Sequence, residues 1–253
     1  MARDYLSLYA GLEDLPDPAL AILPLGAVES HGPHLPLGTD TILAERLLDR
    51  ALSDWPEAPA GLLRLPALWL GASGEHDQGR GTLSLEAEET IALIQAIGGQ
   101  LARAGLRRLL LFNAHGGNVA ASQIAALALR RRHGLLVAAA HWLDFGLPEA
   151  LTPPSPPQAD VHGGWLETSL LLHLAPDLVR RELLANSPAV APAASLYPAG
   201  PIAWGWRAQD LAPGGWIGHP EAASAEIGAA LTAQVTAGLR RLLGDLLRAA
   251  WPG

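Results

Sequence analysis

The residues of this chain best suited to chemistry gather after four apolar segments. Each segment ends in a short group of histidines, carboxylates or carboxamides, and these groups are Glu29, His31 and His34; Glu75, His76 and Asp77; Asn113, His115 and Asn118; Asp160, His162 and Glu167. In α/β sheets, ligands bind beyond the carboxyl ends of the strands. If the four segments are strands of one sheet, these groups converge on a common site.

The first group has the composition of a metal site. Alternate residues of an extended segment face the same way, so Glu29 and His31 can point at one spot, and Asp40 can return to it from the start of the next helix. Borderline divalent metals favour imidazole with carboxylate, and a carboxylate that joins two metals can help to activate a shared water. The pattern therefore indicates a metal-dependent hydrolytic site.

Other kinds of active site lack local support. A single histidine or glutamate at a strand end is usually only solvated, but four groups on one sheet edge favour a site. The segment Gly71–Gly74 (GASG) does not complete a serine nucleophile elbow, and the chain has no P-loop, no G-x-G-x-x-G and no H-E-x-x-H. The absence of cysteine also excludes thiolate ligands.

Apolar strands alternate with helical patterns along the chain. The predicted strands are Ala19–Leu25, Gly61–Leu70 (interrupted by Pro66), Arg108–Phe112 and Gly134–Ala140. The predicted helices are Thr41–Leu52, Leu85–Ala104 with Ser84 as its cap, 118–132, Leu166–Leu174 and Pro220–Trp251, the last with a possible break near Gly244. Leu147–Gln158 and Ser187–Gly218 are predicted to be irregular. This alternation predicts one α/β domain over residues 1–253, with a mostly parallel sheet covered by helices on both faces.

The overall composition bears on the size of the core, on possible binding partners and on the cellular compartment. The chain has 253 residues, a net charge of −8 and 49% hydrophobic residues, which is enough to bury a sizeable core. The acidic balance gives no support for nucleic-acid or anionic-membrane binding. No apolar run reaches membrane-spanning length, and the N-terminus lacks signal-peptide features, so we expect a cytoplasmic protein.

Five motifs, in order along the chain, resemble the signatures of the creatininase (creatinine amidohydrolase) family. They are LPLGAVESHGPHLPLGTD (Leu23–Asp40), GASGEHDQGRGTLSL (Gly71–Leu85), NAHGGN (Asn113–Asn118), HGGWLETS (His162–Ser169) and GWIGHPEAA (Gly215–Ala223). The resemblance implies a three-layer α/β/α sandwich, two divalent ions (zinc or manganese, with iron as a further choice) and a homo-oligomer, with hexamers frequent in the family.

The resemblance also assigns roles to single residues. It implies Glu29, His31, Asp40 and His115 as metal ligands, with Asp40 joining the two ions, and His162 as the residue that carries a proton to the leaving nitrogen. Glu75 and His76 are predicted to orient the substrate or the ligands, although a local structural hydrogen bond explains them equally well. His34 is predicted to support the ligand residues or to be structural, and His133, His141, His173 and His219 are predicted to be non-catalytic.

One position departs from the family pattern. Creatininase itself carries a metal-binding glutamate two residues after the histidine of the third signature, where this chain has Gly117. Glu167 is the predicted replacement ligand. Members of the HGGN type include formylamide deformylases and a peptidase that trims the mycofactocin precursor, so the substrate is predicted to be a small-molecule or peptide amide.

Two questions remain open from the sequence. Trp204, Trp206 and Trp216 either wall the pocket or pack a loop onto the core or a subunit interface. The chain is predicted to be a binuclear metal-dependent amidohydrolase that cleaves an amide C–N bond, and the alternative is a non-catalytic metal-binding or scaffold protein that kept the fold. His162 separates the two, because a structural site has no use for a proton carrier.

Overall fold

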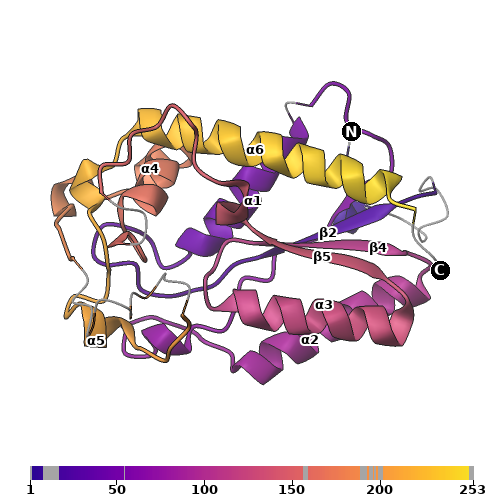
Figure 1. Cartoon of the computed structure of the whole chain (residues 1–253), viewed down its shortest axis with the longest axis horizontal. Coiled ribbons are helices and arrows are strands. Elements are labelled where there is room, and N and C mark those ends of the chain that lie inside the picture. Colours follow the sequence, from indigo (N-terminus) through magenta and orange to yellow (C-terminus); the bar gives the residue numbers. More distant parts are fainter. Residues whose placement is uncertain are drawn as a thin grey trace.

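A five-stranded parallel sheet forms the centre of the computed structural model, which describes residues 2–7, 17–53, 55–155, 159–188, 193, 196, 198 and 202–250. The strand order is β1-β3-β2-β4-β5 (Figure 1). The strands are β1 (Arg3–Asp4), β2 (Leu20–Leu25), β3 (Leu62–Arg64), β4 (Arg108–Asn113) and β5 (Leu136–His141). Leu25 pairs with Asn113 and Asn113 with His141, so the carboxyl ends of β2, β4 and β5 lie level at one edge.

Helices cover both faces of the sheet and give the predicted three-layer α/β/α architecture. One face carries α1 (Thr39–Ser53), α4 (Trp165–Leu174) and α6 (Ala225–Arg248), and the other carries α2 (Ala87–Arg103) and α3 (Asn118–His133) (Figure 1). The short helices are α5 (Ala208–Leu211) and 3-10 turns at Tyr5–Ser7, Gly74–His76, Trp142–Phe145, Pro176–Leu178, Arg181–Leu183 and Pro220–Ala222.

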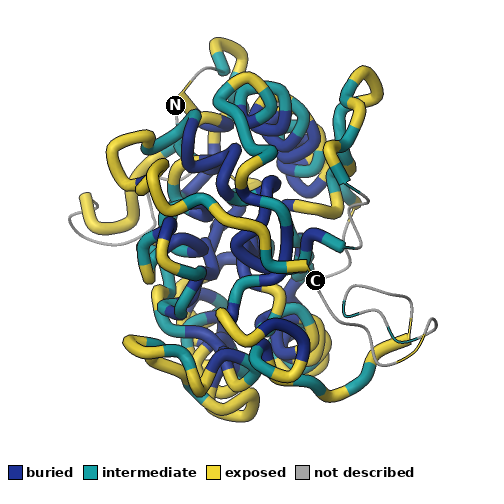
Figure 2. Tube along the Cα trace, turned by 90° about the vertical axis from the view of Figure 1, so that its left-hand side faces the viewer, coloured by how far each residue is buried: buried dark blue, intermediate teal, exposed yellow. Residues whose placement is uncertain are grey.

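The alternation of side chains along β2 explains why its sequence is apolar throughout. Leu20 and Ile22 pack into the core beneath α1, α4 and α6, whereas Ala21 and Leu23 pack against α2 and α3. Every residue of β2 is buried, as expected for a central strand of a parallel sheet. Figure 2 shows this buried interior, with exposed residues on the outer turns and loops.

Several predicted boundaries are wrong, each for an identifiable physical reason. Strand β3 covers three residues of the predicted ten, because Pro66 lacks a backbone N–H for the ladder. Helix α2 begins after Glu86, whose N–H donates to the Glu89 carboxylate at 2.9 Å, while the Ser84 hydroxyl accepts the N–H of Ser73 at 2.8 Å and so links two loops.

The closing helix also differs from its prediction. Helix α6 starts five residues later than predicted, after the cap Ser224, and continues without a break through Gly244. Strand β1 was not predicted, since two residues carry no alternation. Parts of the predicted irregular segments (156–158, 189–192, 194–195, 197 and 199–201) and the predicted helix end at Trp251 lie outside the described residues. Among the described helices, none has the length and apolar character needed to cross a bilayer.

Candidate metal centre and active site

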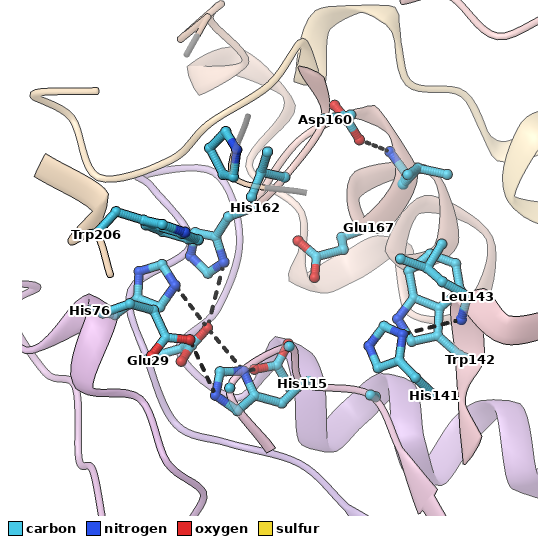
Figure 3. Close-up of a pocket in the computed structure, with 18 of the residues that line it drawn as sticks. Glu29, His76, His115, His141, Trp142, Leu143, Asp160, His162, Glu167 and Trp206 are labelled. Atoms are coloured by element: carbon cyan, nitrogen blue, oxygen red, sulfur yellow. Dashed lines mark hydrogen bonds and ion pairs between the residues drawn. The ribbon is translucent and has the colours of Figure 1, made fainter. Parts of the chain in front are cut away.

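Residues from all four polar groups predicted at the sheet edge meet around one buried carboxylate, that of Glu29. Glu29 follows β2 and is fully buried. Its Oε1 lies 3.4 Å from His115 Nδ1, 3.5 Å from His76 Nε2 and 3.5 Å from His162 Nδ1 (Figure 3). The convergence expected from the strand order is therefore present in the structure.

The backbone fixes the orientation of three of these imidazole rings. Each ring has one nitrogen within hydrogen-bond distance of a main-chain carbonyl: His31 Nδ1 and Glu29 at 3.1 Å, His115 Nε2 and Ala72 at 2.7 Å, His162 Nε2 and Ser30 at 2.6 Å. When those nitrogens donate, the remaining nitrogen of each ring faces the carboxylates. Metal-binding histidines usually have this arrangement, because the carbonyl sets the tautomer and the ring orientation.

Asp40, from the first turn of α1, lies between two groups of potential ligands. Its Oδ1 is 3.1 Å from His31 Nε2 and its Oδ2 is 3.2 Å from His115 Nδ1. One group is Glu29, Asp40 and His115, and the other is His31, Asp40 and Glu167; within each group the candidate ligand atoms lie within 4.8 Å of one another. The structure thus brings together all five residues predicted to bind metal.

The carboxylate oxygens at this centre lack ordinary partners. Both oxygens of Glu29 and Oδ2 of Asp40 are buried without a hydrogen bond of normal geometry from any described residue. They have only ion-pair contacts with neighbouring imidazoles. A buried, unsatisfied carboxylate is costly, and bound cations commonly compensate such a cost. The residues present therefore fit a divalent metal centre.

The pKa shifts at this centre also favour a bound cation. Burial raises the pKa of Glu29, but His115, His76 and His162 outweigh this cost and hold that pKa well below its usual range. Burial disfavours the charged form of His31, yet Asp40 and Glu167 raise its pKa to about 10. Positive charge is thus favoured between these carboxylates, where metal ions could take the place of protons.

His162 and His76 form a stack at the edge of this centre. Their ring centroids are 3.8 Å apart with planes at 24°, and the His162 ring also lies 4.1 Å from that of His31. Burial, with contributions from His76 and His31, lowers the pKa of His162 well below its ordinary value. Glu29, His31 and His162 also form a possible ligand group, so a ligand role stands beside the predicted proton-carrier role.

The structure gives a steric reason for glycine at position 117. A Cβ added there would overlap the carbonyl oxygen of Ala72, the same oxygen that lies 2.7 Å from His115 Nε2. Glu167 approaches from α4 instead: its Oε1 is 3.8 Å from His31 Nε2, and its Oε2 accepts the N–H of Gly163 at 2.6 Å. Burial raises the pKa of Glu167 to about 7. Its role as the replacement ligand stays a prediction that this geometry permits.

We expect Gly117→Ala to lower the free energy of unfolding by about 1–3 kcal/mol, the usual cost of overpacking a filled site. The added methyl group must displace the Ala72 carbonyl and so loosen His115. Gly116→Ala is the matched control, because a Cβ at Gly116 meets nothing within 4 Å. Denaturant unfolding of both variants measures the difference; equal stability of the two would contradict this steric account.

Two asparagines hold the strand-end loops together. The Asn118 side chain accepts the N–H of Ala72 at 3.0 Å and donates to the carbonyl of Gly26 at 3.0 Å. The Asn113 side chain accepts the N–H of His115 at 3.1 Å and donates to its carbonyl at 2.7 Å. These bonds join the loops after β2, β3 and β4, and explain the carboxamides of the third motif as positioning residues.

A cavity of about 500 Å³ opens beside the centre. Its walls include Glu75, His76, Trp204 and Trp206, and the rings of Trp206 and His76 form a T-shaped pair with centroids 6.4 Å apart. Trp216 is not among the lining residues; its Nε1 donates to the carbonyl of Ala185 at 2.9 Å. Two of the three tryptophans therefore wall the pocket, and the third packs a loop.

Two further histidines make contacts that the sequence alone did not reveal. His34 is fully buried, and its Nε2 donates to the carbonyl of Gly163 at 2.8 Å, which ties the first motif to the loop that carries His162. His141, at the end of β5, lines the cavity together with Trp142 and Leu143. Because its partners come from its own turn and from distant loops, no motif in the sequence marks it.

The fold and this buried carboxylate–imidazole centre define a class of α/β protein with a site suited to divalent metals. The chain matches the Creatininase (creatinine amidohydrolase) family over residues 10–243. The chain therefore belongs to the creatininase family of amidohydrolases.

The chain is similar in sequence to mycofactocin precursor peptide peptidases and to a creatinine amidohydrolase. A mycofactocin precursor peptide peptidase of Mycobacterium tuberculosis (strain CDC 1551 / Oshkosh) is 36% identical over 166 residues, which cover 64% of this chain and 61% of that protein. The same-named protein of Mycobacterium ulcerans (strain Agy99) is 34% identical over 85% of this chain and 80% of its own length. A creatinine amidohydrolase of Pseudomonas putida is 31% identical over 71% of this chain and 74% of that protein.

Solved structures match nearly the whole chain. A putative creatinine amidohydrolase from Bacteroides fragilis NCTC 9343 superposes with a TM-score of 0.82 at 24% identity, covering 99% of this chain and 98% of that one, which shows the shared fold. A creatininase variant described as Zn-Zn type has a TM-score of 0.76 at 26% identity, covering 98% of this chain and 100% of the other. A creatininase described with Mn has a TM-score of 0.75 at 25% identity, with the same coverage.

Proposed function

We propose that this protein is a binuclear metal-dependent amidohydrolase that cleaves an amide C–N bond. The observation that carries the proposal is the position of Asp40, which is buried and belongs to two ligand groups at once. One ion would be held by Glu29, Asp40 and His115, and the other by His31, Asp40 and Glu167. Nitrogen and oxygen donors of this kind suit zinc, manganese or iron.

Bound ions at such a centre would polarise the amide carbonyl and lower the pKa of a water molecule. The chain itself would supply the remaining functions. His162 contacts Glu29 and also lines the cavity, where it can carry a proton to the leaving nitrogen. Glu75, whose pKa is raised by burial, lies 3.9 Å from His115 Nε2 and can orient the substrate or that ring.

The dimensions of the cavity bear on the class of substrate. A volume of about 500 Å³ lies within the usual range for ligand pockets and exceeds the needs of a single small ring. The relatives include proteins named for a peptide and for creatinine. We therefore place short peptides and larger formylamides ahead of creatinine as candidate substrates.

The activity can be tested with a substrate panel. Metal-loaded protein, prepared separately with zinc and with manganese, is incubated with short peptides, N-formylated amines and cyclic amides, and mass spectrometry follows the gain of one water. We expect hydrolysis of at least one class, and loss of that hydrolysis after chelation. Metal-loaded protein that binds panel members without hydrolysing any of them would support the scaffold alternative.

Glu167→Gln should reduce the metal content from two ions per chain to one. The amide is a weaker ligand than the carboxylate, while its oxygen can still accept the N–H of Gly163 and preserve the loop. Glu75→Gln is the matched control and should retain both ions, because Glu75 belongs to neither proposed ligand group. Elemental analysis measures both variants. Two tightly bound ions in Glu167→Gln would place the missing ligand elsewhere.

A further inference from the structure

The wall formed by residues 141–143 is a part of the cavity that supplies none of the candidate metal ligands. In Figure 3, His141, Trp142 and Leu143 lie on the other side of Glu167 from His162 and His76. All of these residues line the same cavity. A substrate whose reacting amide lies at the metal centre would therefore extend its other end toward this wall.

The local fold fixes the hydrogen-bonding state of His141. The Nδ1 of the His141 ring accepts the backbone N–H of Leu143 at 3.3 Å, and the Asp144 carboxylate accepts the backbone N–H of His141 at 2.8 Å. Because Nδ1 is an acceptor, the neutral ring carries its hydrogen on Nε2. No described residue pairs with Nε2, so this N–H is available to a ligand. Burial lowers the pKa of His141 to about 4, which keeps the ring neutral at physiological pH.

The remainder of the wall lacks positive charge. Trp142 and Leu143 are aromatic or apolar, and none of the described residues that line the cavity is arginine. The whole chain contains no lysine. Arg207, next to Trp206, lies outside the lining and pairs with Asp77 at 3.3 Å. An anionic group at this end of a substrate would lose its hydration without gaining a charged partner.

We propose that His141 is a specificity-determining residue whose Nε2–H donates to an uncharged oxygen of the substrate, away from the reacting amide. The inference deepens the proposed function and rests on it. The preferred substrates are then neutral amides with a second carbonyl, such as the interior of a peptide, and an anion at that end is disfavoured.

The test uses hydroxamic acids, which chelate divalent metals and need no turnover. Three matched series of compounds are compared, which differ in one group placed three to five bonds from the hydroxamate. That group is a carbonyl in the first series, a methylene in the second and a carboxylate in the third. Calorimetric titration of zinc-loaded protein should show that the best carbonyl compound binds about 3- to 10-fold more tightly than its methylene partner, the usual worth of one neutral hydrogen bond. The carboxylates should bind more weakly than the carbonyl compounds.

Two variants separate a specific contact from a structural effect. His141→Phe removes the donor but keeps a ring, and should erase the preference for the carbonyl without changing metal content or methylene binding. His141→Gln, which keeps an N–H at a similar reach, should restore part of that preference.

The possible failures are distinguishable. A carbonyl preference that persists in His141→Phe, or tightest binding of the carboxylates, would overturn the role of His141 and leave the proposed function intact. If zinc-loaded protein binds none of the hydroxamates, or if the protein takes up no zinc, the proposed function fails and this inference fails with it.

Discussion

Asp40→Ala should remove both metal ions and lower amide hydrolysis by about 10³-fold or more, since Lewis-acid stabilisation of the transition state is worth several kcal/mol. Asp40 is 1% exposed and is the residue shared by the two proposed ligand groups. Any other single ligand belongs to only one of those two groups. Elemental analysis and the hydrolysis assay, run on the same preparation, measure both effects.

Asp160→Ala is the matched control for Asp40→Ala. Asp160 is also a buried aspartate that lines the cavity, but its carboxylate accepts the N–H groups of Trp165 and Leu166 at 2.8 and 2.9 Å, at the start of α4. Its loss should lower the free energy of unfolding by about 1–3 kcal/mol while both ions stay bound. Retention of one ion in Asp40→Ala would refute the shared-ligand assignment.

His162→Ala should retain both ions and lower turnover by roughly 10²–10⁴-fold, the usual worth of a positioned acid–base group. The expectation follows from two observations: the Nδ1 of His162 lies 3.5 Å from Glu29 Oε1, and His162 lines the cavity. Single-turnover kinetics measure the loss, and elemental analysis of the same sample decides between the two roles that the geometry permits. Loss of metal in parallel with activity would make His162 a ligand.

A remote histidine controls for nonspecific effects of losing an imidazole. Helix α3 begins beside His115 and ends at His133. At about 1.5 Å per residue, its length places His133 roughly 20 Å from the start of the helix. His133→Ala should match the parent protein in turnover and metal content. Parent-like turnover in His162→Ala would exclude His162 from the mechanism.

The strands and helices that position the site could be predicted because their physical causes are local. The continuous apolar runs of β2 and β4 indicate buried parallel strands, and the carboxyl ends of such strands share one edge. Strand β1 could not be predicted from two residues. The start of α2 was predicted wrongly because Ser84 and Glu86 both suit a cap, and only the tertiary contact of Ser84 with Ser73 distinguishes them.

The candidate site was predictable to the extent that its residues cluster in sequence. Glu29 and His31 are two residues apart, and their ligand roles stay predictions that the geometry supports. His141 was predicted to be non-catalytic, and a lone histidine after a strand belongs to no motif that would indicate a place in the cavity. Its place in the cavity depends on the turn at Trp142–Phe145. The steric role of Gly117 likewise depends on Ala72, 45 positions earlier, which no local pattern can indicate.

The most direct test of the central claim is the number of divalent ions bound by the parent protein. The protein is stripped with a chelator, titrated with zinc and separately with manganese, and the bound metal is measured by elemental analysis against protein concentration. The two groups that share Asp40 predict two ions per chain, with nitrogen and oxygen ligands only. Saturation at one ion per chain would contradict the binuclear centre, and no binding of either metal would contradict a metal-dependent enzyme altogether.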